Sequence, residues 1–362
     1  MKKIIVIADK MGDMSSLEVA TALNEGIKTL LPGMDTHCVP ITDGGEGTLE
    51  AYKLALGGEQ VELEVTGPFA GEKIKASYGK LFDGVAVIEL AATAGKKLVE
   101  GRENVGEATT YGAGELMLHA MRHGAARIVL ALGGEAALDG GCGAAVAMGA
   151  KFMKKDYTEF VPTASTLSEI ASIDYGELME NLGQCEVMVN CDAQTMLCGE
   201  NGTAAVEGPA KGATPEQIAE IDAGLGHMAE VIAENVGTDV RDWQGAGVAG
   251  GMAAGAAVFF GGLLMPSVDI ALDTVHYDRL LKGADVVFIA EGAAQQPGKV
   301  AVSAARMAKE MGVKTVVIAP DAKAKEAEYQ AVAISEVVDA PAEISAASLN
   351  AAIQKILEDM RA

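Results

Sequence analysis

The sequence predicts an α/β protein with two interwoven domains, one built on a doubly wound parallel sheet. Two stretches, which begin at Lys3 and Ala284, repeat the rhythm of a buried strand, a turn and an amphipathic helix. This alternation is typical of doubly wound parallel sheets. Residues 60–90 show instead the short alternating pattern of antiparallel strands, with the hairpin signal Asp83-Gly84. We therefore expect a second α/β domain, with a mixed sheet, inserted into the first.

Composition restricts the classes of partner. The 362 residues are 49% hydrophobic and only 4% aromatic, so an aliphatic core is expected. The formal net charge of −23 argues against nucleic acid and anionic membranes, which would repel the chain. It leaves an anionic substrate open, because a nearby Lys or Mg²⁺ can outweigh distant charges.

The cysteines and the apolar runs predict a cytoplasmic protein. The five cysteines are an odd number without metal-type spacing, which is typical of reduced thiols. The printed sequence begins with a strand-like run and not with an export signal. The longest apolar stretch, 251–265, is glycine-rich and too short to span a membrane.

The pattern of residues 3–41 predicts the start of the parallel sheet. Residues 3–8 are a continuous β-branched run, as in a strand buried on both faces. Ser15 or Ser16 can cap a helix that ends near Leu31, and a second strand is expected at 37–41. Ligands of such sheets bind outside the carboxyl ends of the strands. Asp9 and the run 42–48 both fall at strand ends.

The remaining elements follow from the same patterns. In the middle we expect a helix at 111–123, a strand at 128–132, a small-residue helix at 144–150, a polar surface connection with short helices at 154–183, a strand at 187–191, a loop at 199–212 and a helix at 214–235. At the end we expect strands at 286–289, 314–319 and 332–338, and helices at 300–311, 323–329 and 346–361. The doubly wound domain then comprises 1–59, 101–133 and 276–362, and the inserted domain comprises 60–100 and 134–275.

One run concentrates the groups that phosphate and metal chemistry needs. Residues 42–48, T-D-G-G-E-G-T, combine the carboxylates of Asp43 and Glu46 with three glycines. Glycines free backbone N–H groups for a ligand, and carboxylates hold metal ions or accept protons. Acidic, glycine-rich echoes at 133–141 and 290–292 predict a shared site built from distant segments. The alternative is that each Gly-Gly pair only forms a tight turn.

Three weaker motifs stay open. Gly245, Gly247 and Gly250 match G-x-G-x-x-G, but no strand is predicted before them, which disfavours NAD; close packing or a loop beside a cleft is the alternative. Lys211 lies between turn residues, where it can bind an anion or be solvated. Lys299 begins a helix, so the free N–H groups there make a phosphate site a candidate.

An ordered set of motifs covers essentially the whole chain: T-D-G-G-E-G-T (42–48), V-T-G-P (65–68), T-T-Y-G-x-G-E-L (109–116), G-G-x-x-x-x-D-G-G-x-G (133–143), C-D (191–192), L-C-G-x-x-G (197–202), G-P-x-K-G-A (208–213), G-A-G-x-A-G-G (245–251) and E-G (291–292). This set resembles the bacterial glycerate kinases that phosphorylate D-glycerate on its 2-hydroxyl. The resemblance implies a flavodoxin-like doubly wound domain, ATP and Mg²⁺ as cofactors, and a small hydroxy acid as substrate. A homodimer is left open.

The resemblance also assigns roles to residues. Asp43 and Glu46 are expected to coordinate Mg²⁺ or to accept the substrate proton, with Asp139, Asp192 and Asp9 as further catalytic candidates. Substrate or phosphate binding is expected from Lys10, Gly44, Gly45, Gly133, Gly134, Gly140, Gly141, Lys211, Glu291, Gly292 and Lys299.

Three motifs depart from the family pattern. The first turn reads A-D-K-M-G-D and lacks a Lys directly before its Gly, although Lys10 can substitute from a shifted position. The family's G-G-S-A-T-N-D-G-G is G-G-E-A-A-L-D-G-G here, and E-G-R-L-D is E-G-A-A-Q. The alternative function is therefore a catalytically impaired paralogue that binds or regulates, or a kinase with a changed substrate.

Overall fold

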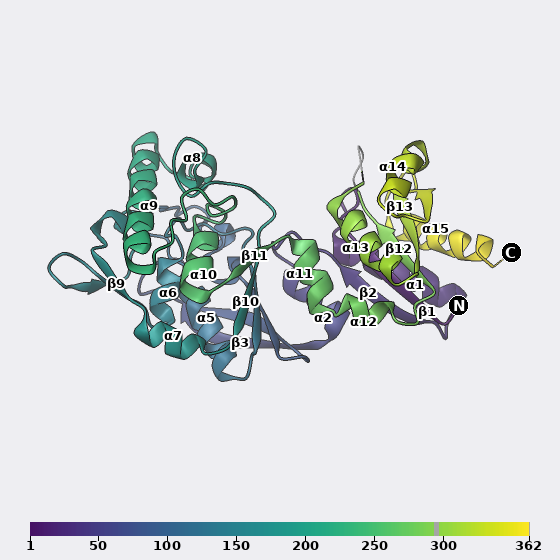
Figure 1. Ribbon diagram of the computed structural model, residues 1–362, viewed down its shortest axis with the longest axis horizontal. Helices are drawn as coiled ribbons and strands as arrows, with labels where there is room; N and C mark the ends of the chain where they lie inside the picture. The colour runs from purple at the N-terminus through teal and green to yellow at the C-terminus, as the bar shows by residue number, and fades with distance from the viewer. Residues whose placement is uncertain (293–296, 362) are drawn as a thin grey trace. The chain divides into compact units, whose positions relative to one another are not determined.

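The structure is a computed structural model that describes residues 1–292 and 297–361 (Figure 1). The chain divides into two compact units. The first comprises residues 1–42, 50–57 and 267–362, and the second comprises residues 43–49 and 58–266.

The first unit is a flavodoxin-like parallel sheet, as predicted. Its strands follow the order β14-β13-β12-β1-β2, and every pair is parallel. Numbered within this sheet alone the order is 2-1-3-4-5, so the order reverses between β1 and β12. The strands are β1 (Lys3–Ala8), β2 (Asp35–Pro40), β12 (Val286–Ala290), β13 (Lys314–Ala319) and β14 (Glu336–Asp339).

Helices cover both faces of this sheet (Figure 1). Ile4 shares a core cluster with Leu23 and Ile353, and its strand neighbour Ile5 is equally buried on the opposite face. The helices of the unit are α1 (Ser16–Leu30), α2 (Thr48–Leu56), α11 (Ser267–Thr274), α12 (Tyr277–Leu281), α13 (Lys299–Glu310), α14 (Glu326–Ala331) and α15 (Ala346–Asp359), with a 3₁₀ turn η3 (Lys323–Lys325). Burial on both faces explains why these strands are continuous apolar runs.

Two local devices fix helix α1. The Ser15 side chain accepts the Glu18 N–H, and the Ser15 N–H donates to the Glu18 carboxylate at 2.8 Å, which forms a capping box. Gly26 allows the close approach of α15, since a Cβ at this position would lie 2.4 Å from Ile353 Cγ2. The predicted cap is thus confirmed, whereas the glycine contact is visible only in the fold.

The second unit contains a six-stranded mixed sheet of order β11-β10-β6-β5-β4-β3. Strands β3 to β5 are antiparallel, and β5, β6, β10 and β11 are parallel. The bounds are β3 (Gly58–Thr66), β4 (Lys73–Leu81), β5 (Val85–Glu89), β6 (Arg127–Ala131), β10 (Glu186–Asn190) and β11 (Leu263–Met265). This confirms the predicted α/β unit with a mixed sheet.

The sheet corrects one predicted domain segment. Residues 101–133 were expected in the doubly wound domain, but β6 lies between β5 and β10 in the mixed sheet. A buried apolar strand followed by glycine looks the same in either sheet, so the local pattern did not distinguish them. Helix α5 (Tyr111–Arg122) also belongs to the second unit.

Two further segments differ in part from expectation. The polar connection 154–183 has the expected short helices, η1 (Leu167–Glu169) and α7 (Gly176–Leu182), but it also contributes β8 (Glu159–Phe160) and β9 (Ser172–Asp174) to a small sheet, β8-β7-β9, with β7 (Lys151–Met153). The expected loop 199–212 contains α8 (Thr203–Glu207) and a 3₁₀ turn η2 (Pro209–Lys211). These pieces are too short for a periodic signal to develop.

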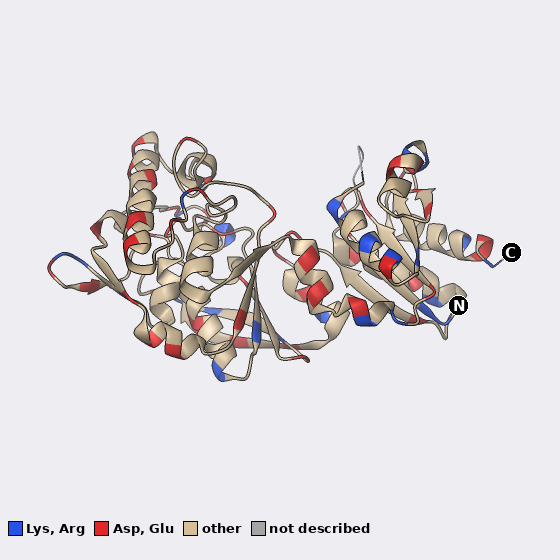
Figure 2. Ribbon diagram, in the orientation of Figure 1, with Lys and Arg blue, Asp and Glu red and all other residues tan. Residues whose placement is uncertain are grey.

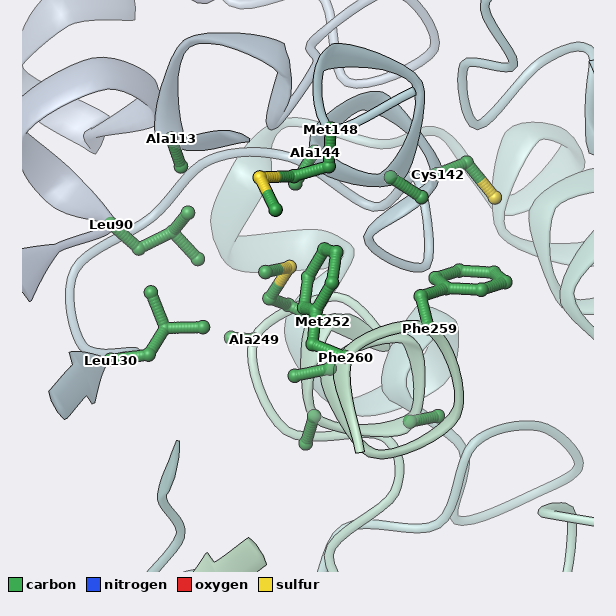
Figure 3. Close-up of a cluster of buried hydrophobic side chains, with 14 of the residues drawn as sticks. Leu90, Ala113, Leu130, Cys142, Ala144, Met148, Ala249, Met252, Phe259 and Phe260 are labelled. Atoms are coloured by element: carbon green, nitrogen blue, oxygen red, sulfur yellow. The ribbon is translucent and has the colours of Figure 1, made fainter. Parts of the chain in front are cut away.

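In the core of the second unit, small side chains such as alanine pack against larger ones such as methionine and phenylalanine (Figure 3). Ala144 and Cys142 face Met252 and Phe259 across α6 (Cys142–Ala147) and α10 (Met252–Phe260), all of them buried. The other helices are α3 (Ala91–Ala94), α4 (Lys96–Val99), η1 (Leu167–Glu169), α7 (Gly176–Leu182) and α9 (Pro215–Val236). The low aromatic content is thus compensated by close contacts between small residues.

Charged residues are distributed over both units, and several positions along the ribbon of α9 are acidic (Figure 2). Among the described helices, none combines the length and the apolar character that crossing a bilayer requires.

A buried carboxylate, Asp139, ties the turn after β6 to two helices. It is 1% exposed and accepts hydrogen bonds from the N–H groups of Thr110 (2.8 Å), Gly141 (3.0 Å) and Gly143 (3.2 Å). The Thr110 hydroxyl also donates to it at 2.9 Å. Burial raises the pKa of Asp139, and these donors oppose the increase. The geometry gives Asp139 a structural position in place of the predicted catalytic one.

We predict that Asp139→Ala lowers the free energy of unfolding by about 3 kcal/mol, because several buried N–H groups lose their acceptor. Urea denaturation measures the change. Exposed Asp242 is the matched control, and Asp242→Ala is expected to stay within about 0.5 kcal/mol of the wild type. Equal, small effects at both positions would contradict the structural role of Asp139.

Candidate active site

The run 43–49 lies directly against the ends of β6 and β10. The Gly133 N–H donates to the Gly44 carbonyl at 2.8 Å. A Cβ at Gly44, where φ is 78°, would lie 2.9 Å from Asn190 Cβ, and one at Gly133 would lie 2.7 Å from Gly45 Cα. These glycines therefore serve close packing of backbone on backbone. That packing sets the position of Asp43, whose carboxylate accepts the Gly45 N–H at 3.1 Å.

Glu89, which the sequence reasoning missed, holds the other end of this run. It is the last residue of β5 and accepts the Leu49 N–H at 2.9 Å, and the N–H groups of Gly47 and Thr48 also stabilise its charged form. Burial raises the pKa of Glu89 nevertheless. The only signal in the sequence was a carboxylate at the end of a predicted strand.

A cavity of about 410 Å³ opens at the carboxyl ends of the parallel strands of the mixed sheet. Asp43, Asn190 and Asp192 line it, the last two at the end of β10. Its other lining residues are Lys96, Leu132, Gly133, Glu135, Ala193, Val206, Glu207, Ala210, Lys211, Val248 and Ala249. The structure thus brings two predicted carboxylates, Asp43 and Asp192, into one cavity at the edge where parallel sheets bind ligands.

Lys211 lines this cavity, but its ammonium group is buried and bound by partners within the protein. The side chain is 2% exposed and forms ion pairs with Glu135 and with Glu207, the latter at 2.8 Å. It also donates to the Ala137 carbonyl at 2.9 Å. Burial raises the pKa of Glu135, and the charge of Lys211 opposes the increase. The positive charge of Lys211, which was predicted to bind an anion, is therefore compensated by the carboxylates of Glu135 and Glu207. The sequence did not predict these two partners.

The predicted metal pair Asp43 and Glu46 is not brought together in one cluster. Glu46 is exposed, forms an ion pair with Lys97 and does not line the cavity. Within the described residues, no group of three or more His, Cys, Asp and Glu side chains has the geometry to hold a metal ion. Mg²⁺ in kinase sites commonly uses one or two carboxylates together with substrate phosphates. Asp43 and Asp192 fit that sharing arrangement, whereas Glu46 does not.

The predicted phosphate cradle does not match the backbone geometry. The Gly140 N–H donates to the Gly250 carbonyl at 3.0 Å, and the Gly141 N–H is taken by Asp139. The Gly133 N–H is taken by the Gly44 carbonyl. Gly134, with φ of 79°, is exposed beside them. Three of the four predicted glycine donors are thus used inside the fold.

The glycines of the G-x-G-x-x-G match also serve packing. A Cβ at Gly247 would lie 1.8 Å from the Met196 carbonyl oxygen, and one at Gly250 would lie 2.1 Å from that of Ala137. No strand of the described chain directly precedes Gly245. The arrangement supports the packing interpretation over a dinucleotide site.

In the first unit, Asp9 and Glu291 follow the two strands between which the strand order reverses. The Asp9 N–H donates to Ala290, and a Cβ at Gly292 would lie 2.6 Å from the Lys10 carbonyl oxygen. Lys10 itself is exposed. This is the crevice position at which doubly wound sheets bind ligands.

Glu291 occupies part of the helix N-terminus at which a phosphate site was predicted, before Lys299. Its carboxylate accepts the N–H groups of Gly298 (2.9 Å) and Ala301 (3.2 Å) and the Tyr329 hydroxyl (2.9 Å). The N-terminus of α13 therefore already carries an internal anion, and Lys299 is exposed beside it. Residues 293–296 of the divergent motif lie outside the described residues.

Comparisons with known proteins agree on one family. The model of the glycerate kinase family matches residues 4–361. A glycerate kinase from Halalkalibacterium halodurans is 36% identical over 88% of this chain and 85% of its own, and a glycerate 2-kinase from Escherichia coli (strain K12) is 37% identical over 85% and 82%. The crystal structure of a Salmonella typhimurium LT2 protein provisionally named glycerate kinase 2 has a TM-score of 0.87 at 33% identity, covering 99% of this chain and 98% of that one. The chain belongs to the glycerate kinase family and is a kinase by descent.

Proposed function

We propose that the protein transfers the γ-phosphoryl group of ATP to the 2-hydroxyl of D-glycerate. The observation that carries the proposal is the cavity at the carboxyl ends of β6 and β10, where Asp43 and Asp192 stand together. The names of the relatives support glycerate as the substrate. The transfer from ATP and the site of phosphorylation rest on the resemblance and on this carboxylate arrangement.

In the proposed reaction, the hydroxyl oxygen of the substrate attacks the γ-phosphorus and ADP leaves with the bond electrons. Asp43 accepts the hydroxyl proton, and its second role is to orient that hydroxyl. Its carboxylate is held by the Gly45 N–H, so little reorganisation is required. Asp43 and Asp192 are the cavity residues that would hold Mg²⁺ together with the substrate phosphates, and the bound ion would supply positive charge to the transferred group.

A second candidate function is ligand binding without turnover. Glu135 stands where the family pattern has a serine, and its ion pair removes Lys211 from substrate binding. Phosphoryl transfer depends on charge neutralisation, so this loss favours an impaired or redirected enzyme. Nucleotide binding in the absence of ADP formation distinguishes this candidate from the kinase.

We predict that the purified protein forms ADP from ATP only when D-glycerate and Mg²⁺ are both present. A coupled assay measures ADP, and glycerol in place of D-glycerate is the control for a substrate without a carboxylate. Binding of a nonhydrolysable ATP analogue without ADP formation would support the second candidate. If the protein neither binds the analogue nor forms ADP, both candidate functions are excluded.

Asp43→Asn is expected to reduce kcat at least about 100-fold, because the amide cannot accept the substrate proton. The Asn side chain keeps the acceptor for the Gly45 N–H, so the melting temperature should change little. Full activity of Asp43→Asn would remove Asp43 from the proposed mechanism.

Glu89→Gln is expected to lower kcat/KM about tenfold, since the run 43–49 loses a charged acceptor. The pKa of Glu89 is raised in the folded protein, so on acidification it takes up its proton at a higher pH than an ordinary glutamate. Wild-type activity should therefore fall as the pH drops through that value, and Glu89→Gln should lack this decline. Identical pH profiles would contradict the role of Glu89.

A further inference from the structure

We propose that Lys96 provides the positive charge for the anionic group bound in the cavity, the role that the sequence had assigned to Lys211. The proposal deepens the proposed function, because it names the residue that would hold the carboxylate or phosphate of the ligand. It rests on how the charges around the cavity are distributed.

Lys211 is occupied. Its ammonium group is buried between Glu135 and Glu207 and also donates to the Ala137 carbonyl, which uses the three hydrogens of the group. Taking Lys211 from these partners would leave Glu135 as a buried, unpaired carboxylate, which is strongly unfavourable. An incoming anion would have to replace two carboxylates that are already in place.

Lys96, in contrast to Lys211, is exposed. It lies at the start of α4, its side chain lines the cavity and it is exposed. In the described part of the chain no carboxylate forms an ion pair with it. Its backbone is fixed by a hydrogen bond from the Lys96 N–H to the Gly134 carbonyl at 2.9 Å. The residue therefore combines an anchored backbone with an ammonium group available to a ligand.

The balance of charges makes Lys96 decisive. The cavity is lined by two lysines, Lys96 and Lys211, and by four carboxylates, Asp43, Glu135, Asp192 and Glu207. Since Glu135 and Glu207 compensate Lys211, Lys96 is the other lysine of this lining whose charge can attract an anion. Lys96 also lines a neighbouring cavity of about 240 Å³, together with Lys97 and Lys211, so its side chain stands where the two spaces meet.

Binding of D-glycerate and of inorganic phosphate, measured by calorimetry without nucleotide, tests the proposal. Lys96→Met should weaken binding of both ligands about tenfold or more, the effect of losing one charged hydrogen bond. Lys96→Arg should retain most of the affinity. Lys155, exposed in the same unit, is the matched control, and Lys155→Met should bind like the wild type.

A double variant distinguishes a change of charge from general damage. Glu135→Gln leaves Lys211 with one carboxylate partner, so in the Lys96→Met background it should restore part of the lost affinity. If Lys96→Met binds like Lys155→Met, or if the wild type binds neither ligand, the proposal is overturned. If anion binding depends on Lys96 but no ADP forms from D-glycerate, the proposed function fails and the role of Lys96 stands.

Discussion

The contact between the run 43–49 and the strand ends of the mixed sheet is the constraint on which the cavity depends. Gly44 and Gly133 approach so closely that a Cβ at either position would overlap its neighbour. A side chain there would push the run outward and carry Asp43 away from Asp192. Glu89 secures the other end of the run through its backbone N–H groups. Glycine and a half-buried carboxylate thus position the proposed reacting group from behind.

The buried charged groups of this unit are compensated by partners inside the fold. Asp139 receives backbone and hydroxyl donors, and Lys211 receives two carboxylates and a carbonyl. Both residues lie in motifs shared with the family, and both are too enclosed to bind a ligand directly. Asp43, Asp192 and Lys96, by contrast, line the wall of the cavity. This separation of structural from accessible charges is the basis of the proposed assignment.

Strands, long helices and caps were predictable from the sequence because their signals are local. The run 3–8 is apolar throughout as a result of burial on both faces, and Ser15 and Thr214 cap their helices through side chains three residues away from their partners. The sheet to which β6 belongs was not predictable, since strand pairing is decided by distant residues. The same holds for Glu135, whose partner Lys211 is 76 residues away. Glycines were recognised as important, but close packing and phosphate binding leave the same pattern of residues.

Under the proposed function, the hydroxy acid binds in the cavity at the ends of β6 and β10. A crystal structure with D-glycerate, Mg²⁺ and a nonhydrolysable ATP analogue tests this binding mode most directly. We expect the substrate hydroxyl within hydrogen-bonding distance of Asp43 and the substrate carboxylate beside the Lys96 ammonium group, with the Glu135–Lys211 ion pair intact. A substrate bound away from Asp43, or a carboxylate held by Lys211 after that ion pair has opened, would contradict it.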